Sequence, residues 1–248
     1  MHEGIHVVLA AERLGSLWGF PITNSLLMTW LVMLLLIGFA VFFRRTLALI
    51  PGKLQAGIEM AFEGALAYMS EVLGSDKLAR RFFPLVATIF LFVALANVLE
   101  FVPGVGSIGL VHADKFLPLL RAPAADLNFT LALAMISFFT IEVTGIAMLG
   151  FFRYAGKYLN VHSPIGFVVG LIELMSNLGR LISFSFRLFG NIFAGEVMIL
   201  VASFFLPYFL PAPLMAFEMF IGLVQALVFA MLTLFFIKLA ITDPAEAH

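Results

Sequence analysis

Residues 165–206 read IGFVVGLIELMSNLGRLISFSFRLFGNIFAGEVMILVASFFL and are almost continuously apolar. A helix of this length is about 63 Å long, roughly twice the hydrocarbon thickness of a bilayer. The run therefore forms either two membrane spans with a tight turn or one long, strongly tilted helix. Its polar side chains favour the single helix, because spacings of three and four place them near one helical face: Glu173, Ser176, Arg180, Ser183, Arg187 and Asn191.

The composition of the whole chain indicates a protein embedded in a membrane. Of its 248 residues, 62% are hydrophobic and 12% are charged, whereas soluble domains contain about 25% charged residues. Such a chain cannot cover its apolar surface in water, so the bilayer serves as its solvent. We therefore expect residues 1–248 to form a single all-α integral membrane domain.

Further apolar runs bring the expected number of transmembrane helices to about five. Residues 213–241 return from the long run as the second arm of a tilted hairpin. Residues 46–82 mix polar and apolar side chains, which is typical of an amphipathic helix lying in the membrane interface. Residues 1–24 precede the first span, and the three remaining spans are predicted at residues 25–43, 83–102 and 128–152.

Positive charge predicts the orientation of these spans, because cytoplasmic loops are enriched in lysine and arginine. The segment after the first span is basic, with Arg44, Arg45, Lys53, Lys77, Arg80 and Arg81, whereas the loop after the second span holds only Lys115 and Arg121. Residues 46–82 are therefore expected in the cytoplasm and residues 1–24 in the periplasm. With five spans, the C-terminus is cytoplasmic.

Several classes of function are not supported by the sequence. The chain has no cysteine and a formal net charge of -1, so neither thiolate metal sites nor nucleic-acid binding is indicated. The five histidines are scattered without the spacing of a zinc hydrolase, and no phosphate-binding or dinucleotide-binding motif occurs. We expect no cofactor, no metal and no covalent chemistry on this chain.

Arg187 is the most unusual residue of the long run. An ionised side chain near mid-bilayer costs about 2.5 to well over 10 kcal/mol, and such residues commonly mark ion or substrate paths. A structural ion pair is the alternative, but Glu173 and Glu196 lie about 21 Å and 13.5 Å away along the helix. Arg180 lies nearer the cytoplasmic end, where extension of its side chain to the interface is an equally good explanation.

Two carboxylates meet if the last two segments form an antiparallel hairpin turning at Pro207–Pro213. Glu196 and Glu218 then lie at similar depth, and Gln225 follows Glu218 on the same helical face seven residues later. Two carboxylates in one dry site cannot both ionise cheaply, which suits a proton relay. Separate hydrogen bonding of each glutamate is the inert alternative.

The segment SFSFRLFGNIFAGE at residues 183–196, with QALVFAMLTL at residues 225–234, resembles subunit a of the F-type ATP synthase family. The run PAADLNFT at Pro123–Thr130 and the glutamate fourteen residues before Arg187 extend the resemblance over the chain. That family forms the membrane stator facing a ring of c subunits. The resemblance implies peripheral-stalk b subunits and the rest of the F1Fo synthase as further partners.

The resemblance also implies roles for individual residues. Arg187 is expected to be the essential arginine between two offset aqueous half-channels, coupling proton flow to rotation of the c-ring. The inner half-channel is expected to contain Glu173 and Ser176. The outer half-channel is expected to contain Asn191, Glu196, Glu218, Gln225 and Asp126. Short loops and the lack of a transit peptide favour a bacterial inner membrane as the location.

Three other functions are considered from the sequence. A secondary transporter would use Arg187 to bind an anionic substrate, but it would require interrupted helices in two matching halves, and the continuous polar stripe argues against this. An intramembrane enzyme would need paired metal ligands or a nucleophile with a base. A passive scaffold does not account for so many polar residues in two apolar segments.

Overall fold

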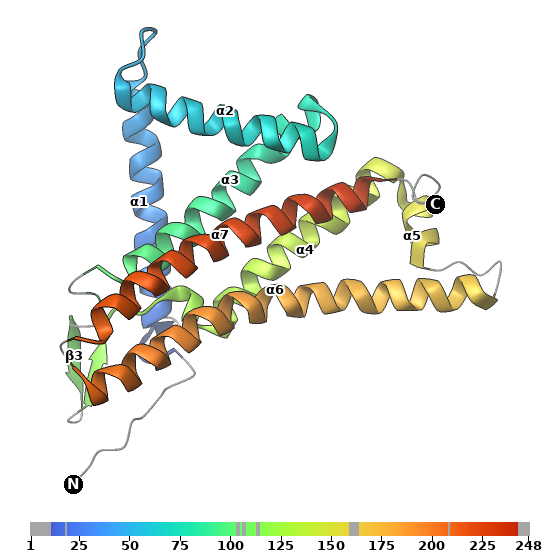
Figure 1. The fold of residues 1–248 in the computed structure, drawn as a ribbon. Coiled ribbons are helices and arrows are strands. Elements are labelled where there is room, and N and C mark those ends of the chain that lie inside the picture. The colour runs from blue at the N-terminus through green and yellow to red at the C-terminus, as the bar shows by residue number, and fades with distance from the viewer. Residues whose placement is uncertain are drawn as a thin grey trace.

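The computed structural model describes residues 11–17, 19–102, 105, 108–112, 115–158, 164–207 and 209–242. Seven α-helices and a short 3-10 helix make up most of this part of the chain (Figure 1). Two small antiparallel hairpins are formed by β1 with β2 and by β3 with β4. The elements are β1 (Arg13–Leu17), β2 (Phe20–Thr23), α1 (Asn24–Thr46), α2 (Lys53–Leu73), α3 (Asp76–Leu99), β3 (Gly109–His112), β4 (Lys115–Pro118), η1 (Pro123–Ala125), α4 (Leu127–Leu149), α5 (Phe151–Tyr158), α6 (Pro164–Phe205) and α7 (Pro211–Ile241).

The expectation of an all-α membrane protein is confirmed. Among the described residues, five helices are long and apolar enough to cross a membrane, namely α1, α3, α4, α6 and α7. Much of their surface is apolar and exposed, as in Leu34, Ile37 and Phe42 of α1. Such a surface is stable in hydrocarbon but not in water. The chain is an integral membrane protein.

The long apolar run forms one uninterrupted helix. Helix α6 has 42 residues and contains every polar residue of the stripe described above. Helix α7, of 31 residues, begins at Pro211, where the missing amide of proline costs no helical hydrogen bond. The two helices lie side by side near their connection and separate toward their other ends (Figure 1).

The segment between the first two spans differs in detail from the expected interfacial stretch of residues 46–82. Helix α2 covers only its middle and ends at Gly74, whose φ of 70° is the left-handed geometry of a helix end. Helix α3 then begins at Asp76, seven residues before the expected span, and continues through Pro84. The charges of Asp76–Arg81 conceal this first part from a search for apolar runs.

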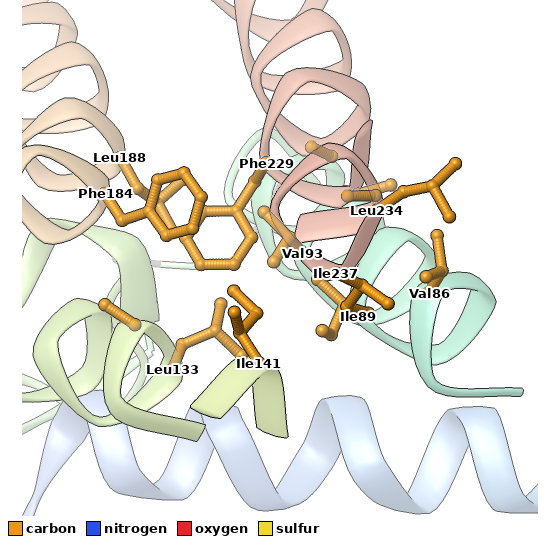
Figure 2. Packing of buried hydrophobic residues seen from close by; sticks show 14 of the residues in the cluster. Val86, Ile89, Val93, Leu133, Ile141, Phe184, Leu188, Phe229, Leu234 and Ile237 are labelled. Atoms are coloured by element: carbon orange, nitrogen blue, oxygen red, sulfur yellow. The ribbon is translucent and has the colours of Figure 1, made fainter. Parts of the chain in front are cut away.

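The core lies where four helices converge. Buried side chains from α3, α4, α6 and α7 interdigitate there, while α1 contributes little (Figure 2). The ring centroids of Phe184 in α6 and Phe229 in α7 are 5.0 Å apart, and Phe236 lies 5.4 Å from Phe184 on the other side. This packing fixes the part of α6 next to Arg187 against α7.

Candidate functional site

Arg187 lies on an exposed face of α6, away from the core. The neighbouring side chains Ile182 and Phe186 are each 56% exposed. Among the described residues, the hydrogen bond given for Arg187 joins its Nη2 to Ser183 Oγ at 3.4 Å, which is long for such a contact. Ser176 is also exposed, about two turns before Ser183 on the same side of the helix. A charged group is therefore presented outward from an apolar surface.

Other members of the polar stripe turn toward α7. The guanidinium of Arg180 lies over the ring of Phe236, 4.8 Å from its centroid, which is a favourable cation–π geometry. Asn191 donates from Nδ2 to Gln225 Oε1 at 2.7 Å. Arg187 therefore lies on the edge of the stripe that faces outward, whereas Arg180 and Asn191 lie on the edge that contacts α7.

Glu218 of α7 is packed against the backbone of α6. Its side chain is 2% exposed, and neither carboxyl oxygen has a hydrogen-bond partner among the described residues. A Cβ placed on Gly195 would overlap the Glu218 carboxyl group, so glycine at this position is what leaves room for it. Gly195 directly precedes Glu196, so the segment of α6 that carries Glu196 lies beside Glu218.

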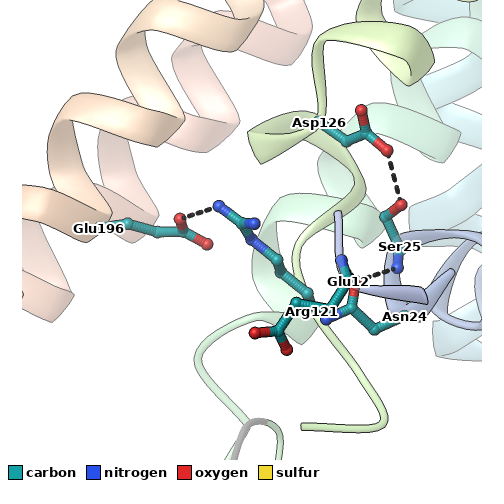
Figure 3. A network of polar contacts seen from close by, with 6 residues as sticks. All are labelled: Glu12, Asn24, Ser25, Arg121, Asp126 and Glu196. Carbon is teal, nitrogen blue, oxygen red and sulfur yellow. Dashed lines mark hydrogen bonds and ion pairs between the residues drawn. The ribbon is translucent and has the colours of Figure 1, made fainter. Parts of the chain in front are cut away.

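Glu196 forms an ion pair that was not expected from the sequence. Arg121 Nη2 lies 3.0 Å from Glu196 Oε2 (Figure 3). The two side chains are 13% and 26% exposed, respectively, so water screens the pair only in part. Arg121 was identified only as a charge of the loop before η1. The tertiary fold, and not any local spacing, brings it to α6.

Asp126 is placed at the start of α4 rather than beside Glu218. Its carboxylate accepts the backbone N–H of Asn128 at 3.0 Å, which caps the helix. Its other oxygen accepts from Ser25 Oγ at 2.7 Å, so α1 and α4 are joined at their first residues (Figure 3). Asp126 is therefore bound to α1, whereas Asn191 and Gln225 bind one another between α6 and α7.

Asn97 is a second polar residue that the sequence did not assign. It is fully buried in α3, and its Nδ2 donates to the Gly222 carbonyl oxygen of α7 at 2.9 Å. Gly222 lies one turn before Gln225 on the same helix. An asparagine interrupting an apolar span was the available signal, because a buried amide needs a partner.

The N-terminal half of α6 belongs to a different polar cluster. Asn177 donates from Nδ2 to Glu142 Oε1 of α4 at 3.3 Å, and Tyr154 of α5 donates from its hydroxyl to Glu142 Oε2 at 2.9 Å. Any side chain on Gly145 would overlap the Tyr154 ring. Glu173 lies one turn before Asn177 and Ser176 directly precedes it. The structure thus separates these two residues from Glu196 and Glu218.

The site contains acids, amides and one exposed cation, and it has the composition of a proton or ion path. Within the part of the chain that the structure describes, no group of three histidine, cysteine, aspartate or glutamate side chains could hold a metal ion. Burying an unpaired ionised carboxylate such as that of Glu218 costs several kcal/mol. A group in this position is suited to taking up and releasing a proton.

Comparison with known proteins gives consistent similarities. The family model described as the ATP synthase A chain matches residues 26–238. ATP synthase subunit a of Campylobacter concisus is 33% identical over 218 residues, covering 88% of this chain and 89% of the relative. ATP synthase subunit a of Campylobacter hominis is 33% identical, covering 94% and 96%. The sodium ion specific subunit a of Propionigenium modestum is 32% identical, covering 94% and 79%.

Proposed function

Because the chain belongs to the family of ATP synthase subunit a, the Fo proton-channel subunit of the F1Fo complex, we propose that Arg187 couples ion flow to rotation of a c-subunit ring. The observation that carries this proposal is the exposure of Arg187 on an apolar face of α6, where its hydrogen bond among the described residues is a long one to Ser183. A cation in such a place is costly unless a counter-charge meets it. A carboxylate on the c-ring is that counter-charge.

The outer half-channel in this proposal follows the contacts between α6 and α7. Asn191, Glu196, Glu218 and Gln225 lead from the connection of the two helices toward Arg187. The proximity of these residues of α6 and α7 is supported by the Asn191–Gln225 hydrogen bond and by the packing of the Glu218 carboxyl group against Gly195. Arg121 holds the carboxylate of Glu196 in place. Asp126 contributes at the entrance, where it ties α4 to α1.

The inner half-channel is formed by Glu173 and Ser176 on the other half of α6. These residues lie about 21 Å and 17 Å before Arg187 along the helix, so the two half-channels open to opposite sides of the membrane and are offset by Arg187. A fixed cation between them repels a proton that would otherwise cross directly. Protons therefore pass only on the carboxylates of the turning ring.

The free energy of ATP synthesis requires that several ions cross the membrane for each ATP made. One charge crossing the membrane yields about 2.3 kcal/mol per 100 mV, which is far below the free energy of ATP synthesis. A rotating ring collects several such steps for each ATP. This chain makes no covalent bond in that cycle and supplies only the ion path and the fixed charge.

The arrangement in the membrane is part of the same proposal. A cytoplasmic location of that side in a bacterial cell is supported by the basic residues at the end of α1 and the start of α3, namely Arg44, Arg45, Lys77, Arg80 and Arg81. The N-terminus then lies in the periplasm and the C-terminus in the cytoplasm. The exposed face of α6 contacts the c-ring, and the peripheral-stalk b subunits contact other apolar surfaces of the chain.

The test replaces Arg187 by alanine in a complete synthase reconstituted into vesicles. We expect ATP-driven proton pumping to fall to background while ATP hydrolysis by the soluble part persists. Arg44→Ala is the matched control, because Arg44 is an exposed arginine at the end of α1, and it should pump normally. Normal pumping by the Arg187→Ala synthase would refute the proposal.

A further inference from the structure

A pocket lies on the opposite side of the molecule from the ion path, where α2 meets α3 and α7. Its volume is about 240 Å³, larger than the ~150 Å³ cavity that suffices for a benzene ring. Its walls are almost purely apolar and come from all three helices: Ala61, Phe62, Ala65, Met69, Phe83, Val86, Ala87, Phe90, Leu91, Leu227, Ala230 and Met231. We propose that this pocket binds one acyl chain of an anionic phospholipid whose phosphate is held by Arg80 and Arg81.

The pocket exists because small side chains face one another across the helices. Ala65 of α2, Ala87 of α3 and Ala230 of α7 all line it, and a longer side chain at any of them would occupy part of the space. Phe62 and Leu227, which also line it, are 42% and 46% exposed. The pocket is therefore accessible from the lipid-facing surface.

Arg80 stands at the level where a phosphate would lie, and Arg81 follows it about 100° around the helix. Arg80 precedes Ala87 and Leu91 by seven and eleven residues, which places it within about 20° of their face of α3. The pocket-lining residues of α3 then begin about 5 Å and end about 17 Å further along the helix. A phospholipid has the same order, with its charged group at the interface and its hydrocarbon chain deeper.

The charges around the pocket favour an anion. Arg80 and Arg81 are both exposed, and the structure gives neither an ion pair with another described residue. Arg81 lies 5.9 Å from the Phe82 ring centroid. Of the α2 glutamates, Glu63 lies about 100° or more around that helix from the pocket-lining residues, whereas Glu59 lies about 60° from Phe62 and Glu71 about 80° from Ala61. Basic residues beside a membrane surface attract anionic lipids.

The experiment uses the complete synthase in phosphatidylcholine vesicles containing a small amount of phosphatidylglycerol with a photoreactive acyl chain. After irradiation, mass spectrometry measures labelling of peptides covering residues 61–69 and 83–91. We expect the phosphatidylglycerol probe to label these peptides about tenfold more than a phosphatidylcholine probe with the same chain. Equal labelling by both probes would overturn the proposal, because it would indicate non-specific contact with the bilayer.

Two variants with matched controls separate the parts of the proposal. Ala87→Leu should fill the pocket and abolish most labelling, whereas Ala40→Leu on the exposed surface of α1 should not. The double variant Arg80→Gln, Arg81→Gln should remove the preference for phosphatidylglycerol, whereas Arg44→Gln, Arg45→Gln should retain it. If Ala87→Leu does not assemble, the arginine variant decides, since its sites are exposed. Lipid binding would be refuted if the arginine variant still preferred phosphatidylglycerol. It would also be refuted if another subunit covered the pocket in the complete synthase and the pocket were not labelled.

Discussion

The two halves of α6 differ in how their polar side chains are satisfied. In residues 188–205, Asn191 and Glu196 are bound by α7 and by the segment before η1. In residues 164–186, Asn177 is bound by Glu142 of α4. Arg187 lies at the boundary, and its hydrogen bond within the described part of the chain is the long contact with Ser183. The hydrogen-bond partners of α6 thus come from α4 before Arg187 and from α7 and the segment before η1 after it, although Arg180 and Phe184 already pack against α7. Arg187 itself faces outward.

After the loss of pumping expected for Arg187→Ala, the largest effect is expected at Gly195, where α6 packs against Glu218 of α7. Gly195→Ala would drive its methyl group into the Glu218 carboxyl, which is 2% exposed and has little space to move. A displacement of this size should lower ATP-driven proton pumping roughly 10- to 100-fold. Proton uptake by reconstituted vesicles measures it.

Gly190→Ala is the control within the same helix, because a Cβ at Gly190 meets nothing within 4 Å. Both substitutions remove one glycine from α6, so any gain in helix propensity is shared. Equal proton pumping by the two variants would show that the packing of Glu218 against Gly195 has no role in the ion path.

A smaller effect is expected from Arg121, which reaches the same half of α6 from outside the helix pair. Arg121→Gln leaves the Glu196 carboxylate without its ion-pair partner at 3.0 Å. We expect proton pumping to fall about threefold to tenfold, which corresponds to about 1 kcal/mol, the net contribution of one ordinary hydrogen bond.

The pair can be tested by a double-mutant cycle with Glu196→Gln. If Arg121 acts through Glu196, the Arg121→Gln substitution should have less effect in the Glu196→Gln background than in the unchanged chain. Fully additive effects on the pumping rate would contradict this, and Arg121 would then act independently of Glu196.

The smallest effect on pumping is expected in the N-terminal half of α6, where hydrogen bonds to Glu142 of α4 come from Asn177 of α6 and Tyr154 of α5. Tyr154→Phe removes the 2.9 Å hydrogen bond to Glu142, which lowers local stability by about 1 kcal/mol. Hydrogen exchange of the α5 amides should accelerate roughly fivefold, with pumping unchanged. Tyr68→Phe, at an exposed site of α2, is the control. If Tyr154→Phe lowered proton pumping as much as Gly195→Ala, the two halves of α6 would not differ in their importance for the ion path.

Composition and the spacing of residues together predicted most of the helices, whereas the roles of the site residues stay predictions. The three- and four-residue spacing of the stripe predicted a continuous α6, because helical periodicity is local. The expected hairpin of residues 165–206 and 213–241 predicted that Glu218 lies near the Gly195–Glu196 segment, since the chain reverses between them at Pro207–Pro213. The start of α3 at Asp76 was missed, because charged residues there hide the helix from a hydropathy window.

What the sequence determined by itself is therefore the membrane as solvent, the long polar-striped helix and the singular position of Arg187. All of these follow from composition and from the helical repeat. Only the tertiary structure decided that Arg121 pairs with Glu196, that Asp126 binds Ser25, and that Asn97 reaches Gly222. These contacts join residues 75, 101 and 125 positions apart, so they depend on how the helices pack in space and leave no periodic signal in the chain.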